Sequence, residues 1–378
     1  MDFTLTENQR SMIQHAQDSA PLLMSASPEA GGMPRDAWNT WGLEGWLGTC
    51  LPEEHGGGGR SAHDTVMGFE ALGFHGVARG QLFSVGAHLF GCAKGIAVFG
   101  TDQQRTKWCP KLASGEKVGA LAFTEPSGGS NLGDCETIIA QDGDGLILSG
   151  KKTHVTNGTD ADVFLVMAAS EAQPPPFNLT VLLVPRETPG LTVRKIDCAI
   201  GLRETAPAEI SFTKCSLPTD CVLGSIGGGL GVLIGIMWWE RTCILAGLLG
   251  ALERDITNVT AYLGQTRGLA EPPIRHQSVA HSLARMRLRS ETARQMLYRG
   301  ASELDHGKDR LVRPAMVKLA VSEAMVDCAV ELLRITAGFG WTGGLGLGQA
   351  LDDAMGALSA SGTSEVQLNM IATGFGRK

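Results

Sequence analysis

The sequence predicts an α+β fold in which a strand-rich segment separates two helical segments. Three observations support this: helical periodicity up to about residue 118, short runs of β-forming residues from Gly119, and the return of the helical period near Gly228. Helices flanking a β-module bury their apolar faces against it or against each other. We therefore expect an N-terminal helical domain (1–118), a central antiparallel β-barrel or sandwich (119–227) and a C-terminal four-helix bundle (228–378).

The N-terminal segment carries clear start and stop signals for helices. Thr6 and Gln9 have the spacing of a capping box, so a helix should begin after Thr6 and run to about Leu23. Residues 52–59, with four consecutive glycines, read as a loop. Further helices are expected at residues 65–74 and 89–99.

The central segment reads as short strands separated by turn residues such as Asp142-Gly143. Expected strands lie at 120–125, 137–140, 146–149, 163–168, 179–184, 191–193 and 209–212. After residue 228, long apolar-periodic segments predict helices through 230–263, 277–304 and 314–337.

Composition excludes several classes of function. Lys and Arg number 32 against 39 Asp and Glu, a net charge of −7, which disfavours nucleic-acid binding. The apolar run 223–239 ends at Glu240 and Arg241, so we expect no membrane span, and the N-terminus predicts no signal peptide. Nine cysteines without a C-x-x-C pair favour a reducing, cytoplasmic setting. No cluster of ligand residues predicts a metal site.

Glu240 is the first candidate for chemistry. On a helix, its neighbours on the same face are all apolar: Ile236, Met237, Cys243 and Ile244. A carboxylate there is costly to bury unless it is paired or protonated. Two interpretations stay open: a carboxylate paired at a subunit contact, or a general base whose pKa is raised in a dry pocket.

Two glycine-rich strand ends are the next candidates. Residues 123–131 form a strand that runs into a turn with hydroxyls on both sides, and such a turn can present polar groups to a ligand. Residues 150–158 predict a strand that places His154 and Thr156 on one face before an Asn-Gly turn. Tight turns without any ligand are the simpler alternative for both.

Four motifs in order resemble the acyl-CoA dehydrogenase family of flavoproteins over essentially the whole chain. The family's T-E-P-x-x-G-S-D motif matches 124–131, with Asn131 in place of Asp. Its G-x-K-x-x-I-T-N-G motif matches 150–158, with Val155 for Ile, its P-E-x-x-G-G loop matches 52–57, and its G-T-S-E-[IV]-Q motif matches 362–367. The resemblance implies FAD bound between the β-module and the C-terminal helices.

The resemblance also implies roles for individual residues. Thr124 and Thr156 would contact the flavin ring, His154 would pack on it where the family has an aromatic residue, and Ser130 would lie near both cofactor and thioester. The full implied cofactor set is Phe123, Thr124, Ser130, His154, Thr156, Arg267, Gln277, Gly338 and Thr363. The implied substrate set is Ser130, Trp239, Arg241, Ser361 and Gly362.

The catalytic base distinguishes branches of the family. Many members carry it directly before the C-terminal G-T, where this chain has Ser361. A branch resembling isovaleryl-CoA dehydrogenase places it on the first long helix of the C-terminal domain, which matches Glu240. A positioned carboxylate is needed because the α-hydrogen of a thioester is only weakly acidic. Trp238 and Trp239 beside it would favour a short acyl group if either lines the pocket, and simple packing is the alternative.

The implied activity is FAD-dependent dehydrogenation of a short acyl thioester of coenzyme A or a carrier protein. The implied partners are electron-transfer flavoprotein as acceptor and further copies of the chain in a homotetramer or homodimer. Departures from the motif that binds the adenine end of FAD, with Arg267 displaced by one position and Ala270 in place of Gly, predict altered FAD affinity or subunit geometry. They also suggest a specialised biosynthetic enzyme. Alternatives are a flavin monooxygenase or oxidase on the same fold, a non-enzymatic binding protein, and a pseudoenzyme without FAD.

Overall fold

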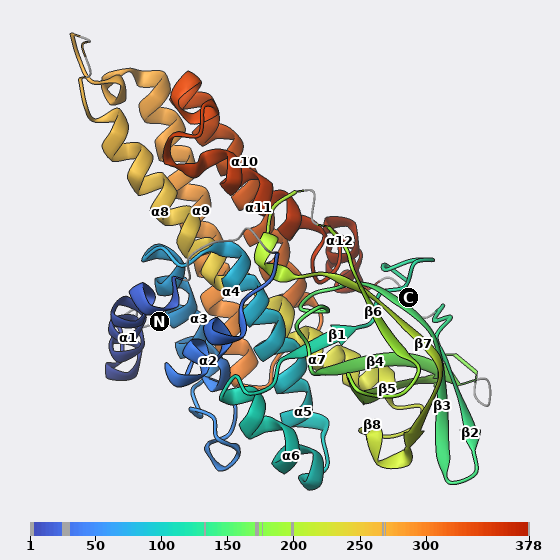
Figure 1. The fold of residues 1–378 in the computed structure, drawn as a ribbon. Helices are drawn as coiled ribbons and strands as arrows, with labels where there is room; N and C mark the ends of the chain where they lie inside the picture. Colours follow the sequence, from blue (N-terminus) through green and yellow to red (C-terminus); the bar gives the residue numbers. More distant parts are fainter. Residues whose placement is uncertain are drawn as a thin grey trace.

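A computed structural model describes residues 4–24, 31–131, 134–170, 174–175, 177–197, 200–266, 268 and 270–376. Helices from both ends of the chain pack together on one side of a twisted sheet, and the ends of three C-terminal helices project beyond the rest (Figure 1). This helix–sheet–helix order confirms the predicted architecture. The expected boundaries at 118/119 and 227/228 stay a prediction.

The N-terminal part is helical, as predicted. The Thr6 side chain accepts a hydrogen bond from the Gln9 backbone N–H, and the Gln9 side chain accepts one from the Thr6 backbone N–H, so the capping box is confirmed. One continuous helical run extends from Arg79 to Phe99 and contains a π-helical stretch. The elements are α1 (Glu7–Leu23), α2 (Arg35–Leu43), η1 (Trp46–Gly48), η2 (Glu53–His55), α3 (Ala62–Phe74), α4 (Arg79–Gly86), the π-helix η3 (Ala87–Ala93), α5 (Lys94–Phe99) and α6 (Asp102–Ala113).

The middle part forms one sheet in the order β6-β7-β3-β2-β4-β5-β8, with β1 also paired to β4. Its strands are β1 (Gly119–Ala122), β2 (Ile138–Asp142), β3 (Gly145–Val155), β4 (Val163–Ser170), β5 (Leu179–Pro185), β6 (Leu191–Lys195), β7 (Ala208–Pro218) and β8 (Val222–Leu223). The expectation of a purely antiparallel module was wrong, because β1 and β2 both run parallel to β4. The β2–β3 hairpin lies between β1 and β4 in sequence, and this long connection permits a parallel pair.

The sheet is covered on both faces at its centre. Along β4, Val163, Leu165 and Met167 belong to the core shared with the helices. The alternate residues Phe164 and Val166 belong to a second apolar cluster on the other face. Side chains of a strand alternate between faces, so this one strand joins the two cores.

The C-terminal part is helical, and the predicted 230–263 segment is two helices. The elements are α7 (Gly229–Cys243), α8 (Ala246–Leu263), η6 (Pro273–Arg275), α9 (Gln277–Asp305), α10 (Val312–Trp341), η7 (Gly344–Gly346), α11 (Leu347–Ser359) and α12 (Ser364–Thr373). Two further segments, η4 (Arg203–Thr205) and η5 (Thr219–Cys221), belong to the sheet's loops. The ends of α8, α9 and α10 project beyond the N-terminal helices (Figure 1).

Two helical stretches, Arg79–Phe99 and Gly229–Leu263, are long and apolar enough to cross a membrane on length and composition alone. Most of each, 83% and 78%, is buried inside the fold, as in the core helices of soluble proteins. These two stretches pack against each other through Gly86 and Ile244, and they bring α7 against the π-helix.

Candidate active site

Glu240 lies where α7 meets the π-helix η3 and the start of the sheet. A Cβ atom added to Gly91 of η3 would lie 3.3 Å from Glu240 Oε2 and 2.7 Å from Leu121 Cδ1 of β1. Glycine therefore leaves room beside the carboxylate, and a π-helix is a frequent marker of a functional site. The backbone of Gly91 thus lies between Leu121 of β1 and the Glu240 carboxylate of α7, three elements that are far apart in the sequence.

The Glu240 carboxylate is buried, with 7% of the residue exposed. Oε1 accepts a hydrogen bond of 2.5 Å from the Ser361 hydroxyl, whereas Oε2 is buried and has no hydrogen-bond partner among the described residues. Burial raises the pKa of Glu240, and the Ser361 hydrogen bond and the Arg241 charge oppose that rise. The arrangement leaves one oxygen free to accept a proton, as a general base requires.

Ser361 is held in place by two side chains. Arg241 Nε donates to its carbonyl oxygen at 2.9 Å, and Gln367 Nε2 donates to the same oxygen at 3.1 Å. Its backbone has φ = 55°, a left-handed conformation that a non-glycine residue adopts only where its surroundings enforce it. Arg241 and Glu240 are adjacent on α7 and point apart, yet both reach Ser361, one through its carbonyl and one through its hydroxyl.

The two predicted flavin segments lie side by side. The Thr153 backbone N–H donates to the Thr124 carbonyl at 2.9 Å, so the turn after β1 is joined to the end of β3. Thr124 and Thr156 are half-buried, and neither hydroxyl has a hydrogen-bond partner among the described residues. Two free hydroxyls next to the buried ring of Phe123 fit a planar, polar ring system such as that of FAD.

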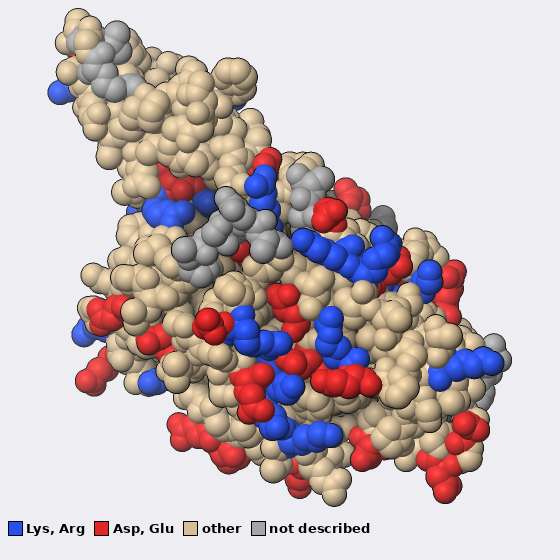
Figure 2. Space-filling model, viewed as in Figure 1, with Lys and Arg blue, Asp and Glu red and all other residues tan. Residues whose placement is uncertain are grey.

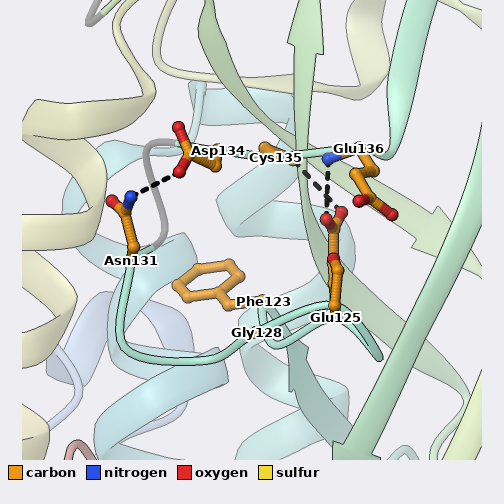
Figure 3. A pocket seen from close by; sticks show the side chains of 8 residues that line it. Phe123, Glu125, Gly128, Asn131, Asp134, Cys135 and Glu136 are labelled. Atoms are coloured by element: carbon orange, nitrogen blue, oxygen red, sulfur yellow. Dashed lines mark hydrogen bonds between the residues drawn. The ribbon is translucent and has the colours of Figure 1, made fainter.

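A buried ion pair stiffens the turn that follows Phe123. Lys152 Nζ, fully buried, donates to Glu125 Oε1 at 2.7 Å and to the Phe123 carbonyl at 3.2 Å. Glu125 Oε2 also accepts from the Glu136 backbone N–H at 2.6 Å. A cavity of about 230 Å³ lies beside this turn, with the Phe123 ring facing into it and an Asn131–Asp134 hydrogen bond at its rim (Figure 3).

His154 and Thr156 do not share one strand face, so that prediction was wrong. The pairing of β3 with β7 is irregular between Lys152 and Val155, and His154 has φ = 52°. This bulge interrupts the two-residue alternation of the strand. His154 is exposed and Thr156 is half-buried. Ser130, in the turn after β1, is also exposed.

The remaining predicted residues divide between the Glu240 site and a distant region. Thr363 accepts from the Val366 backbone N–H and caps α12, and Gly362 lies next to Ser361 with φ = 102°. The half-buried Trp239 ring is covered by Lys94 Nζ at 4.1 Å from its centroid, and Trp238 is covered by Arg310. Both rings therefore pack against cations.

The residues predicted to bind the adenine end of FAD lie far from Glu240. Gln277 begins α9 and Gly338 lies near the end of α10, both at the projecting end of the C-terminal helices (Figure 1). Both are exposed. Arg267 lies outside the described residues. Tyr262 and Phe339 stack there with ring centroids 4.1 Å apart.

Sequence reasoning missed Gly91 and Gln367 as parts of the site. Gly91 had no signal, because its importance depends on the contact between η3 and α7. Gln367 is the last residue of the quoted C-terminal motif, and its buried amide holds the carbonyls of Ser361 and Gly362. Within the described ranges, no group of three His, Cys, Asp or Glu residues could hold a metal ion.

Comparison with known families covers nearly the whole chain. Residues 6–116 match the N-terminal domain of acyl-CoA dehydrogenases, residues 120–215 match the middle domain, and residues 227–375 match the C-terminal domain.

Individual relatives agree with these matches. The chain is 33% identical over 336 residues to an L-prolyl-[peptidyl-carrier protein] dehydrogenase of Pseudomonas fluorescens, which covers 89% of this chain and 88% of that protein. It is 30% identical to the human mitochondrial short-chain specific acyl-CoA dehydrogenase, over 87% of this chain and 79% of that protein. A solved structure described as the FAD complex of PigA superposes with a TM-score of 0.95 at 28% identity, covering 100% and 99% of the two chains.

These matches agree with the fold and with the free hydroxyls beside Phe123. The chain belongs to the acyl-CoA dehydrogenase family and is an FAD-dependent oxidoreductase.

Proposed function

We propose that this enzyme dehydrogenates a short acyl thioester and that Glu240 is its catalytic base. The observation that carries the proposal is that Glu240 Oε2 is buried beside Gly91 with no hydrogen-bond partner in the described part of the chain, while Oε1 accepts from the Ser361 hydroxyl. A raised pKa keeps such a carboxylate basic enough to remove a weakly acidic α-proton. This placement supports the branch that resembles isovaleryl-CoA dehydrogenase.

The surrounding residues support proton abstraction at one oxygen. The Ser361 hydroxyl fixes the carboxylate plane, and Arg241 holds the Ser361 carbonyl, so Oε2 is the oxygen left for the substrate. FAD, when bound, accepts a hydride from the substrate. Phe123, Thr124 and Thr156 would hold its ring, since they lie on two adjacent segments. Phe123 supplies an apolar ring, and the two threonines supply hydroxyls without partners among the described residues.

The first substrates to test are an L-prolyl thioester on a peptidyl carrier protein and a short acyl-CoA. Both present the same thioester, and relatives named for each match most of the chain. The half-buried Trp239, next to Glu240 on α7, supports a short acyl group. The departures from the family motif that binds the adenine end of FAD support a biosynthetic role.

The test is anaerobic flavin absorbance of the holoenzyme during titration with each thioester, beside the Glu240→Gln variant. We expect one thioester to bleach the flavin in the wild-type enzyme and to leave it oxidised in the variant. The matched control is Glu7→Gln, an exposed carboxylate in the first turn of α1 that should leave bleaching intact. Bleaching that survives in Glu240→Gln would exclude Glu240 as the base, and a flavin that no thioester bleaches would favour an oxygen-using reaction.

We further propose that the enzyme works as a homotetramer or homodimer. The ring-binding residues lie at the ends of β1 and β3, whereas Gln277 and Gly338 lie at the ends of α9 and α10 that project away from the sheet, so a second copy would have to bring the two halves of the FAD site together (Figure 1). The projecting helices support self-association: Trp341 is 84% and Leu288 68% exposed, and few charges cover this end on the face in Figure 2.

Light scattering on the eluted holoenzyme tests this proposal. A mass of two or four chains is expected, and Trp341→Glu should reduce both the mass and the bound FAD. A monomer that retains stoichiometric FAD would exclude it. We propose the cytoplasm as the site of action, because the eight described cysteines are all unpaired and stay reduced there. Electron-transfer flavoprotein is the electron acceptor to test first.

A further inference from the structure

Lys318 is a buried cation with no role in the site described above. It lies on α10 with 0% of the residue exposed, on the face that also carries the buried Val321. Its Nζ atom donates to the Leu358 carbonyl oxygen at 2.6 Å. Among the described residues, no carboxylate lies within ion-pair distance of this ammonium.

A lone ammonium is costly to bury unless its contact compensates for the lost water. Leu358 lies in the last turn of α11, where backbone carbonyls have no partner within the helix and carry the negative end of the helix dipole. A cation is the preferred partner for such a carbonyl. Lys318 therefore caps the C-terminal end of α11.

Charged groups from three helices face Lys318. They are Arg241 of α7, Glu323 of α10 itself and Glu365 of α12. Burial and the Arg241 charge lower the pKa of Lys318 to about 8, so the ammonium is the main form at neutral pH. The same Arg241 holds the Ser361 carbonyl, so the two cations meet beside one turn.

The capped carbonyl is three residues from the contact with the base. α11 ends at Ser359, Ala360 is extended with φ = −63° and ψ = 143°, and Ser361 turns into the left-handed region with φ = 55°. The Ser361 hydroxyl then reaches Glu240 Oε1. A shift in the point where α11 ends would move this hydroxyl away from the carboxylate.

We propose that Lys318 is a positioning residue for the base: by holding the Leu358 carbonyl it fixes the end of α11 and keeps the Ser361 hydroxyl on Glu240. This proposal rests on the proposed function of Glu240. Lys318 touches neither the carboxylate nor the space beside Gly91, so its effect passes through the turn.

The test is Lys318→Met, which replaces the lysine with an unbranched side chain of similar length and removes the Nζ hydrogen-bond donor. Hydrogen–deuterium exchange of peptides covering residues 358–367 should become faster, while exchange in the sheet stays unchanged. The acid limb of the kcat/KM profile should move to higher pH, because Glu240 loses the hydrogen bond that favours its charged form. In a Ser361→Ala background, Lys318→Met should add no further shift, since both changes act on one bond.

Val321→Ala is the matched control, because it lowers packing one turn along α10 and removes no hydrogen-bond donor. It should lower the melting temperature and leave the acid limb in place. Lys318→Gln keeps a donor without the charge and provides a second variant if the methionine variant does not fold; its shift should have the same direction. Unchanged exchange at 358–367, or a pH shift that adds fully to that of Ser361→Ala, would overturn the proposal. Full activity of Glu240→Gln would instead overturn the proposed function, and the exchange result would still decide whether Lys318 positions the turn.

Discussion

Removal of the Ser361 hydroxyl tests how the base is tuned. In Ser361→Ala, Glu240 Oε1 loses its 2.5 Å hydrogen bond, and both carboxylate oxygens are then buried without a partner. The hydrogen bond favours the charged carboxylate, so its loss should raise the pKa of Glu240 further above its usual value. The base acts only when ionised, so the acid limb of kcat/KM should move to higher pH.

The size of the shift follows from the energy of the bond. A hydrogen bond to a charged group contributes about 1.5–3 kcal/mol. One pH unit corresponds to about 1.4 kcal/mol, so the limb should move by about 1–2 pH units. Below the limb the variant should be about 10- to 100-fold slower than the wild-type enzyme, and on the plateau the two rates should converge.

The assay is kcat/KM with an artificial electron acceptor, measured across pH for both enzymes at constant ionic strength. The matched control is Ser359→Ala, because the Ser359 hydroxyl bonds to the Gly356 carbonyl in the same turn and does not reach Glu240. An acid limb that stays in place in Ser361→Ala, or one that moves equally in Ser359→Ala, would refute the reasoning.

Three further substitutions test the surroundings of the site. In Gly91→Ala the added Cβ would lie 2.7 Å from Leu121 Cδ1 and 3.3 Å from Glu240 Oε2, so the Leu121 side chain or the π-helix must shift and the space beside the carboxylate is filled. We expect kcat/KM to fall about 10²-fold at unchanged FAD content, and a wild-type value would contradict this. Ala337 has φ = 49° and ψ = −132° within α10, and Ala337→Gly should relieve the strain of a non-glycine residue at these angles. We expect the free energy of unfolding in urea to rise by about 1 kcal/mol, and a lower free energy of unfolding would show that this backbone is unstrained. Lys152→Met leaves the Glu125 charge buried and unpaired, which should cost about 3–5 kcal/mol at neutral pH in the same measurement. Burial raises the pKa of Glu125, but hydrogen bonds from Lys152, Thr137 and Glu136 lower it to about 2. The stabilisation is therefore present above pH 4.5 and is lost as the pH falls towards 2. The difference in unfolding free energy between wild type and variant should shrink over that window, and a constant difference would contradict this.

The helices were the most predictable elements, because their signals are local. The capping box at Thr6 and Gln9 specified the start of α1, and its apolar period extended to Leu23, where the helix ends. Strand positions were also close to their predictions. The parallel pairs of β1 and β2 with β4 were not predictable, since nothing in a short β-forming run specifies its partner's direction.

Local rules failed where the chain departs from regular geometry. His154 was expected to share a strand face with Thr156, but a bulge in β3 gives its backbone φ = 52° and interrupts the alternation of faces. Ser361 and Ala337 also have positive φ values, against the intrinsic preference of non-glycine residues, and at Ser361 the side chains of Arg241 and Gln367 hold this conformation. Such positions tend to lie at functional sites, and Ser361 contacts the proposed base.

The sequence by itself determined the helix–sheet–helix order and the resemblance to FAD-dependent dehydrogenases, because periodicity and motifs are local patterns. It also made Glu240 the candidate base, since an apolar helix face with one carboxylate coincides there with the position that the resemblance implies. Only the tertiary structure decided what surrounds that carboxylate. Gly91 of the N-terminal part leaves space beside it, the Ser361 hydroxyl contacts it from the turn between α11 and α12, and Lys318 of α10 donates to the end of α11. Contacts between residues distant in sequence depend on how whole elements pack, and no pattern within a single helix or strand encodes them.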